Sequence, residues 1–167
     1  MFYIRKKMVE SLSVTYFVLV EELLSSMIFF ITETESQDPF HCEGIPYKKR
    51  QKYMRETRVI DLLIDMLYYP FSDELYHFSE LTQRHPITRI CQLVYRLLKH
   101  CVKDYNYNKF YVAQYIELYF NQAMTATEQN NFKAENTITE LLKNNEVLLD
   151  KQITKETIVN FVELCKG

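Results

Sequence analysis

Residues 86–101 decide the fold class of this chain of 167 residues, and they read Pro86-Ile87-Thr88-Arg89-Ile90-Cys91-Gln92-Leu93-Val94-Tyr95-Arg96-Leu97-Leu98-Lys99-His100-Cys101. Their apolar side chains recur at the helical period, at Ile87, Ile90, Cys91, Val94, Leu98 and Cys101. Proline suits the first position of a helix, because the N–H that it lacks would have no partner there. The stretch therefore predicts a helix with one face in a core.

Similar patterns continue on both sides, and only two glycines and four prolines interrupt the chain. The first expected helices are Ile4–Ile31 and Lys48–Tyr69, and Pro70 ends the second of them. The next expected helix carries the apolar residues Val112, Ala113, Ile116, Phe120 and Ala123. Two more helices are expected after it: one that is capped by Asn136 or Thr137 and runs to Leu142, and one after Thr154 with Ile158, Phe161, Val162 and Cys165. A helical turn is expected in the connector from Ser72 to His85, and Asp104–Asn108 breaks the pattern. So few breakers predict an all-α fold, and the short loops favour an armadillo-like α-solenoid of antiparallel helices.

We divide the chain into an N-terminal helical segment with its linker, 1–46, and a helical domain, 47–167, which together form one continuous solenoid fragment. The last stripe ends at Gly167 without a polar capping helix, which indicates a solenoid cut short.

Composition argues against several functional classes. The net charge is −2, so no global field attracts nucleic acid. The cysteines (Cys42, Cys91, Cys101, Cys165) form neither a CxxC pair nor a zinc spacing, which is typical of reduced cytosolic thiols. In the pairs His41-Cys42 and His100-Cys101, sequence neighbours point in different directions on a helix. No acid, base and nucleophile converge, so we expect no enzyme, cofactor or metal site.

The apolar run Val14–Ile31 raises the question of a membrane span. Glu21 and Glu22 lie at its centre, where each would cost roughly 2.5–3.5 kcal/mol on insertion scales. The uncharged runs on either side are shorter than a span needs. We expect a buried amphipathic helix with both glutamates facing outward, and no transmembrane segment.

Six basic residues fall within Lys48-Lys49-Arg50-Gln51-Lys52-Tyr53-Met54-Arg55-Glu56-Thr57-Arg58. Lys48, Lys52 and Arg55 are spaced i, i+4, i+7 and share one helix face. On one continuous helix that face also carries the apolar stripe Val59, Leu62, Leu63, Met66 and Leu67. Cations at a helix N-terminus oppose the macrodipole, so this row predicts an anionic ligand.

Simpler interpretations remain open. The row could be a solvated helix start, and solvated surface charge is the preferred interpretation for Lys49, Arg50 and Arg58. The same cluster could also dock on phosphoinositide membranes. Tyr105 is as compatible with packing as with ligand contact. The histidines His77, His85 and His100 are taken as ordinary polar groups near helix ends.

The stretch Arg50-Gln51-Lys52-Tyr53-Met54-Arg55-Glu56 resembles the RQKLMRE stretch of inositol 1,4,5-trisphosphate receptors. The similarity continues through Arg89-Ile90-Cys91, Tyr95–His100, Asp104-Tyr105, Asn136–Asn145 and Leu148–Thr154, and covers about Ser11 to the end. The chain is thus similar to the homology domain that inositol 1,4,5-trisphosphate receptors share with ryanodine receptors, and its sequence is closer to the inositol trisphosphate branch.

The resemblance implies the helical, armadillo-like half of a ligand-binding core, with inositol 1,4,5-trisphosphate held between it and a β-trefoil domain of the same receptor. It assigns Lys48, Lys52, Arg55 and Tyr105 to the ligand. Lys48 replaces the family's arginine, so a point charge replaces a bidentate fork. Asn106 and Tyr107 replace an Arg-Lys pair, and Lys103 and Lys109 are candidates to compensate.

The implied function is a regulatory segment of an intracellular calcium-release channel, acting by cleft closure. Such a channel would be a tetramer in the endoplasmic reticulum membrane, with this segment on the cytosolic face; standing alone, the chain would be cytosolic. The alternative is an α-helical interaction scaffold that has lost the ligand.

Overall fold

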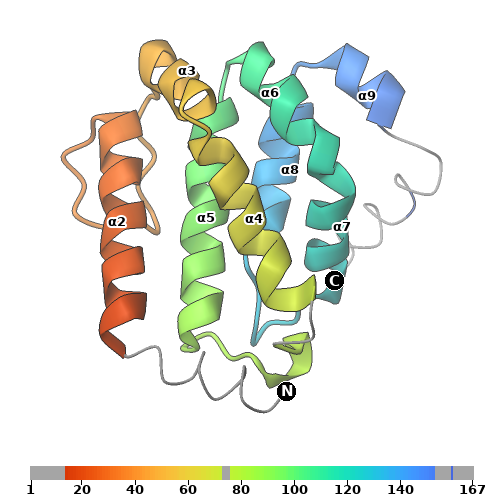
Figure 1. The fold of residues 1–167 in the computed structure, drawn as a ribbon. Coiled ribbons are helices and arrows are strands. Elements are labelled where there is room, and N and C mark those ends of the chain that lie inside the picture. The colour runs from red at the N-terminus through yellow and green to blue at the C-terminus, as the bar shows by residue number, and fades with distance from the viewer. Residues whose placement is uncertain (1–13, 73–75, 153–158, 160–167) are drawn as a thin grey trace.

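The computed structural model describes residues 14–72, 76–152 and 159, and every regular element in them is helical. The elements are α2 (Val14–Thr32), α3 (Lys48–Glu56), α4 (Val59–Ser72), η1 (Phe78–Glu80), α5 (Pro86–Val102), α6 (Asn106–Val112), η2 (Ala113–Tyr115), α7 (Ile116–Thr125), α8 (Ala134–Leu142) and α9 (Glu146–Gln152). The all-α prediction is confirmed (Figure 1). The predicted stretches Ile4–Ser13 and the helix after Thr154 lie outside the described residues.

Helix α5 is the centre of the fold, and α2, α4 and α8 all pack on it (Figure 1). It begins at Pro86, as predicted, and all six residues of its predicted apolar stripe are buried. Leu93, Leu97 and Val102 are buried as well, so the helix is covered on more than one face. A helix enclosed in this way must have the polar groups at its ends satisfied by the protein itself.

The predicted helix Lys48–Tyr69 is instead two helices, because the chain turns at Thr57-Arg58. Arg58 has a positive φ of 62°, a conformation that costs a residue with a Cβ about 1–2 kcal/mol. The Arg58 Nε donates to Asp61 Oδ2 at 2.8 Å, which holds the turn. The basic row and the apolar stripe therefore lie on different helices, and Leu62 of that stripe is 61% exposed.

Three further boundaries differ from the prediction. Pro70 lies inside the last turn of α4, which runs on to Ser72. Helix α8 starts at Ala134, so neither Asn136 nor Thr137 caps it; Thr137 is buried and donates to the Tyr95 carbonyl oxygen at 2.7 Å. The predicted fourth helix is α6, η2 and α7 in series, although its five predicted apolar residues are all buried.

Both glutamates of α2 were predicted to face outward, and the structure confirms this for only one of them. Glu22 is exposed, whereas Glu21 is half-buried and accepts both Nε and Nη2 of Arg89 at 2.9 Å. Among the described residues, no helix combines the length and the apolar character needed to cross a membrane.

In the part of the chain that the structure describes, four helices end at a residue with a positive φ, and none of these residues is glycine. They are Glu33 after α2, Arg58 after α3, Asp104 after α5 and Asn144 after α8. Glycine most often fills this position, because it has no Cβ to clash there. The scarcity of glycine in the sequence therefore does not prevent tight helix ends.

A buried glutamine joins three helices near the core. Tyr95 Oη donates to Gln122 Oε1 at 2.5 Å, and Gln122 Nε2 donates to the Leu67 carbonyl oxygen at 2.7 Å. Helices α5, α7 and α4 are thereby joined through one side chain.

We expect Gln122→Leu to lower the free energy of unfolding by roughly 2–4 kcal/mol, because it leaves a buried hydroxyl and a buried carbonyl unpaired. Urea unfolding followed by circular dichroism measures the loss. Asn121→Leu, at the neighbouring exposed position, is the matched control and should change stability by less than about 0.5 kcal/mol. Equal effects of the two substitutions would contradict this role of Gln122.

The loop 33–47 is fastened to the end of α5 through a buried histidine. His100 Nε2 lies 3.2 Å from the Cys42 carbonyl oxygen. The pKa of His100 is lowered to about 4, mainly by burial and also by the positive charges of Arg96 and Lys99, whereas Glu43 and the Cys42 carbonyl oppose the shift. His100 is therefore neutral at pH 7 in the folded chain.

The unfolded chain binds a proton at this histidine near pH 6.5, and the folded chain does not until about pH 4. The contribution of His100 to stability is thus complete above pH 6.5 and is lost as the pH falls. We expect a loss of about 2 kcal/mol between pH 7.5 and pH 5 that His100→Gln removes. Denaturant unfolding at several pH values tests this, with exposed His77→Gln as the control that should keep the dependence.

Candidate functional site

A hollow of about 440 Å³ lies where the start of α3 faces the turn from α5 to α6. Figure 1 shows α3 and α6 at the same end of α5. The hollow is lined by Lys48, Asp104, Tyr105, Asn106, Tyr107, Lys109 and Asn144. Two predicted site residues, Lys48 and Tyr105, thus meet in it, together with Asn106 and Tyr107.

The elements around the hollow are held by two buried side-chain amides at the C-terminal end of α5. Gln51 Nε2 donates to the carbonyl oxygens of His100 and Lys103, both at 2.8 Å. Asn108 Nδ2 donates to the carbonyl oxygens of Gln51 at 2.9 Å and Cys101 at 2.8 Å. Three of these bonds satisfy carbonyls at the end of α5, and the fourth joins α6 to α3, so that α3 and α6 are fixed to α5.

Arg55 is joined to this network through Asn108. Its Nη1 donates to Asn108 Oδ1 at 2.9 Å, and its guanidinium carbon lies 5.9 Å from the centre of the Tyr105 ring and 5.8 Å from that of Tyr107. A neutral amide and two aromatic rings orient the guanidinium without cancelling its charge. Arg55 does not line the hollow itself, but both rings do.

The two lysines of the predicted row differ in their surroundings. Lys48 is exposed, and its side chain makes no hydrogen bond or ion pair in the described part of the chain. Lys52 Nζ lies 3.4 Å from Glu56 Oε1, and both side chains are exposed, so the pair is worth less than about 1 kcal/mol. Lys52 does not line the hollow.

Lys109 lines the hollow, but its charge is engaged in the fold. The side chain is buried, its Nζ donates to the Lys143 carbonyl oxygen at 2.7 Å, and Glu140 Oε1 is 3.9 Å away. Burial lowers the pKa of Lys109, and the Glu140 carboxylate opposes that shift. Lys109 therefore fastens α6 to α8. Lys103, the other candidate to compensate, does not line the hollow.

The remaining cations of the basic stretch were predicted to be solvated. Lys49 is exposed, but Arg50 is not a free surface charge, because its Nη1 donates to the Phe30 carbonyl oxygen at 2.5 Å and its guanidinium lies over the Phe30 and Tyr47 rings. Arg58 is exposed and paired with Asp61. Arg50 thus fixes α3 to the end of α2.

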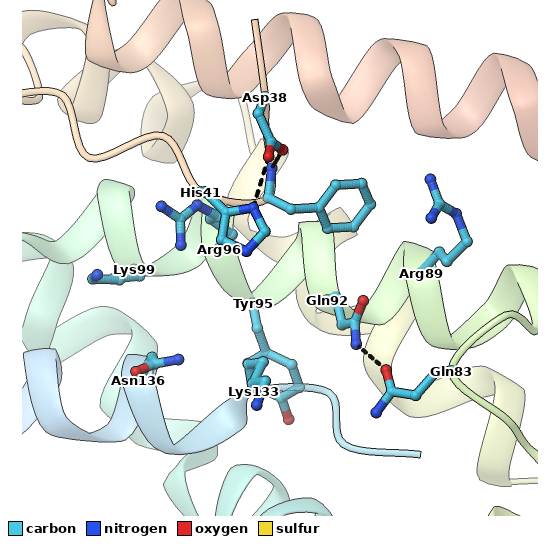
Figure 2. Close-up of a pocket in the computed structure, with 11 residues that line it drawn as sticks. Asp38, His41, Gln83, Arg89, Gln92, Tyr95, Arg96, Lys99, Lys133 and Asn136 are labelled. Carbon is cyan, nitrogen blue, oxygen red and sulfur yellow. Dashed lines mark hydrogen bonds and ion pairs between the residues drawn. The ribbon is translucent and has the colours of Figure 1, made fainter. Parts of the chain in front are cut away.

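A second hollow, of about 460 Å³, lies between the 33–47 loop, α5 and the start of α8 (Figure 2). Most of the cations that line it already have an anionic partner. The ion pairs are Arg89–Glu21, Arg96–Glu43 and Lys99–Glu43, and the His41 Nδ1 lies 2.7 Å from Asp38 Oδ2. An external anion would have to replace these carboxylates, so the hollow beside α3 is the better anion site.

Two polar residues at the candidate site, Gln51 and Asn108, were not predicted from the sequence. Gln51 shares the buried face of α3 with Met54, three residues on, so a polar residue at a core position is the signal that could have marked it. Asn108 carries no such signal, because its partners depend on how α6 returns to α5. No group of three or more His, Cys, Asp or Glu among the described residues could hold a metal ion.

Comparison with known sequences shows the family to which this chain belongs. The RIH domain pattern matches residues 21–167. The inositol 1,4,5-trisphosphate receptor itr-1 of Caenorhabditis elegans is 31% identical over an alignment of 162 residues, which covers 87% of this chain and 5% of the relative. The chain thus spans a small part of that protein. It belongs to the family of RIH domains, which ryanodine and inositol 1,4,5-trisphosphate receptors share, and it is a distant homologue of the latter.

Proposed function

We propose that this chain is a ligand-binding, regulatory segment of an inositol 1,4,5-trisphosphate-gated calcium-release channel. In this proposal the hollow beside α3 takes a phosphate group, with Lys48, Lys52, Arg55 and Tyr105 as its ligand-binding residues. The matched relative is named as a receptor for this ligand, and the family membership supports carrying the function over.

The observation that carries the proposal is the meeting of Lys48 and Tyr105, which are distant in sequence, in one hollow with the Arg55 guanidinium beside the Tyr105 ring. Within the described residues Lys48 has no carboxylate partner, and Arg55 has a neutral one, Asn108. A phosphate could therefore gain charge-assisted hydrogen bonds, and neither Lys48 nor Arg55 would first have to lose an ion pair.

The proposed mechanism is cleft closure. A ligand with several phosphates would bridge this helical half, an armadillo-like α-solenoid, and a β-trefoil domain of the same receptor. Closure would bias a distant gate, because the ligand binds the closed state more tightly. A force that the bound ligand exerts on α3 would be transmitted to the end of α5, because the Gln51 side chain joins the two helices.

In this proposal the chain is one segment of a larger receptor. We place the boundary between the N-terminal segment and the helical domain at residues 46 and 47. The assembled channel would be a tetramer in the endoplasmic reticulum membrane, with this segment on the cytosolic face. No catalytic chemistry, metal or cofactor is part of the proposal.

Substituting Arg55 by Gln in a polypeptide that joins this chain to a β-trefoil domain should weaken inositol trisphosphate binding by roughly tenfold to a hundredfold. Lys48→Gln should act in the same direction, and the double variant Lys52→Gln/Arg55→Gln should abolish binding. Isothermal titration calorimetry at low salt measures the affinities. Lys49→Gln, an exposed cation on the same helix, is the control. Unchanged affinity in the double variant would overturn the assignment.

A second candidate is an α-helical interaction scaffold that no longer binds the ligand. Asn106 and Tyr107 favour it, because both line the hollow and neither carries a charge. Lys109 does not replace the missing cations, since its Nζ is bonded to the Lys143 carbonyl oxygen.

The scaffold function predicts that inositol trisphosphate leaves the melting temperature unchanged even at millimolar concentration, because only a bound ligand stabilises the folded state. The double variant Asn106→Arg/Tyr107→Lys should then show a ligand-dependent rise. Differential scanning fluorimetry compares the two proteins, with inositol as the uncharged control. A rise for the unaltered chain would rule the scaffold out.

A further inference from the structure

An apolar groove of about 650 Å³ lies between α2 and α4, and α5 forms its floor. Both outer helices pack on α5, and Figure 1 shows them on either side of it. Ile87, Ile90 and Cys91 contribute the floor, while Leu23 of α2 and Leu62 of α4 contribute to the walls. The groove is separate from the candidate ligand site, with which it shares no lining residue.

The walls of the groove are unusually apolar for an exposed surface. Leu24, Ile28 and Ile31 of α2 are buried in the core, yet Leu23 of the same helix, which lines the groove, is 57% exposed. Leu62, on the facing helix, is 61% exposed. A helix that is apolar on both sides is normally covered on both sides. Contiguous exposed patches of this kind mark interaction sites.

The shape of the groove indicates the kind of partner. Two helices that rest on a third leave a long channel between them, and a helix is the element that packs at ordinary interaxial distance against such a surface. Leucine side chains along both walls would meet apolar residues at positions i, i+3, i+4 and i+7 of the incoming helix.

The charge of the groove restricts further which kind of partner it can bind. Among the described residues that line the groove, Asp65 is the only charged one, and none is a lysine or an arginine. Asp65 is exposed and makes no hydrogen bond or ion pair in the described part of the chain. A lysine or arginine on the partner would meet this carboxylate at the rim, whereas an acidic residue would be repelled.

We propose that this groove binds an amphipathic α-helix from a segment outside these 167 residues, with its apolar face on Leu23 and Leu62 and a basic residue beside that face paired with Asp65. The matched part of the relative is 5% of its length, so a family chain has ample sequence to supply such a helix.

The proposal is tested with fluorescent peptides of about 18 residues, a length at which an isolated helix can form. A panel carries Leu, Ile or Phe at the i, i+3, i+4, i+7 positions and lysine beside them; scrambled peptides of equal composition are the controls. Fluorescence anisotropy measures binding to the full chain. Leu23→Gln and Leu62→Gln should each weaken binding at least tenfold, and Ile45→Gln, at an 82% exposed position outside the groove, should not.

A charge exchange tests the role of Asp65. Asp65→Lys should weaken binding of the lysine peptides and strengthen binding of peptides with glutamate at the same positions. The proposal is overturned if no peptide of the panel binds, if scrambled peptides bind equally well, or if the two leucine variants bind like the unaltered chain. Light scattering that shows a dimer lost in Leu62→Gln would assign the groove to a second copy instead.

Discussion

The carbonyl groups at the C-terminal end of α5 lie inside the molecule, and the side-chain amides of Gln51 and Asn108 satisfy them. An unpaired buried carbonyl would cost about 1–3 kcal/mol, so these bonds are a condition for burying the helix end at all. They also determine where α3 and α6 lie. The hollow between these helices is therefore a consequence of how the central helix ends.

The same bonds join stability to the proposed function. Asn108 accepts from Arg55 while it donates to the backbone of α3 and α5, so the guanidinium is oriented by a residue that the fold requires. Lys109 differs from Arg55, because it lines the hollow but its ammonium group donates to the Lys143 carbonyl oxygen and so serves the fold. Basic residues close to a site thus divide into those oriented toward it and those that hold its walls together.

Much of the fold could be predicted from the sequence, because apolar period and proline position are local signals. The buried face of α5 and the all-helical class follow from them. The turn at Arg58 could not be predicted, since it depends on a positive φ that the Asp61 pair helps to hold. For the site, spacing placed Lys48, Lys52 and Arg55 on one face, and family resemblance added Tyr105. Only the tertiary packing brings Tyr105 to Lys48 and engages Lys109 elsewhere.

The non-glycine residues that end four helices limit how this sequence can change over evolutionary time. At Glu33, Arg58, Asp104 and Asn144 the backbone adopts a conformation that glycine and asparagine accept with little cost. Valine or isoleucine at these positions would clash with the neighbouring backbone. Descendants of this chain should therefore drift toward small or amide residues there, and β-branched residues should be eliminated even though every one of these positions is on the surface or at its edge.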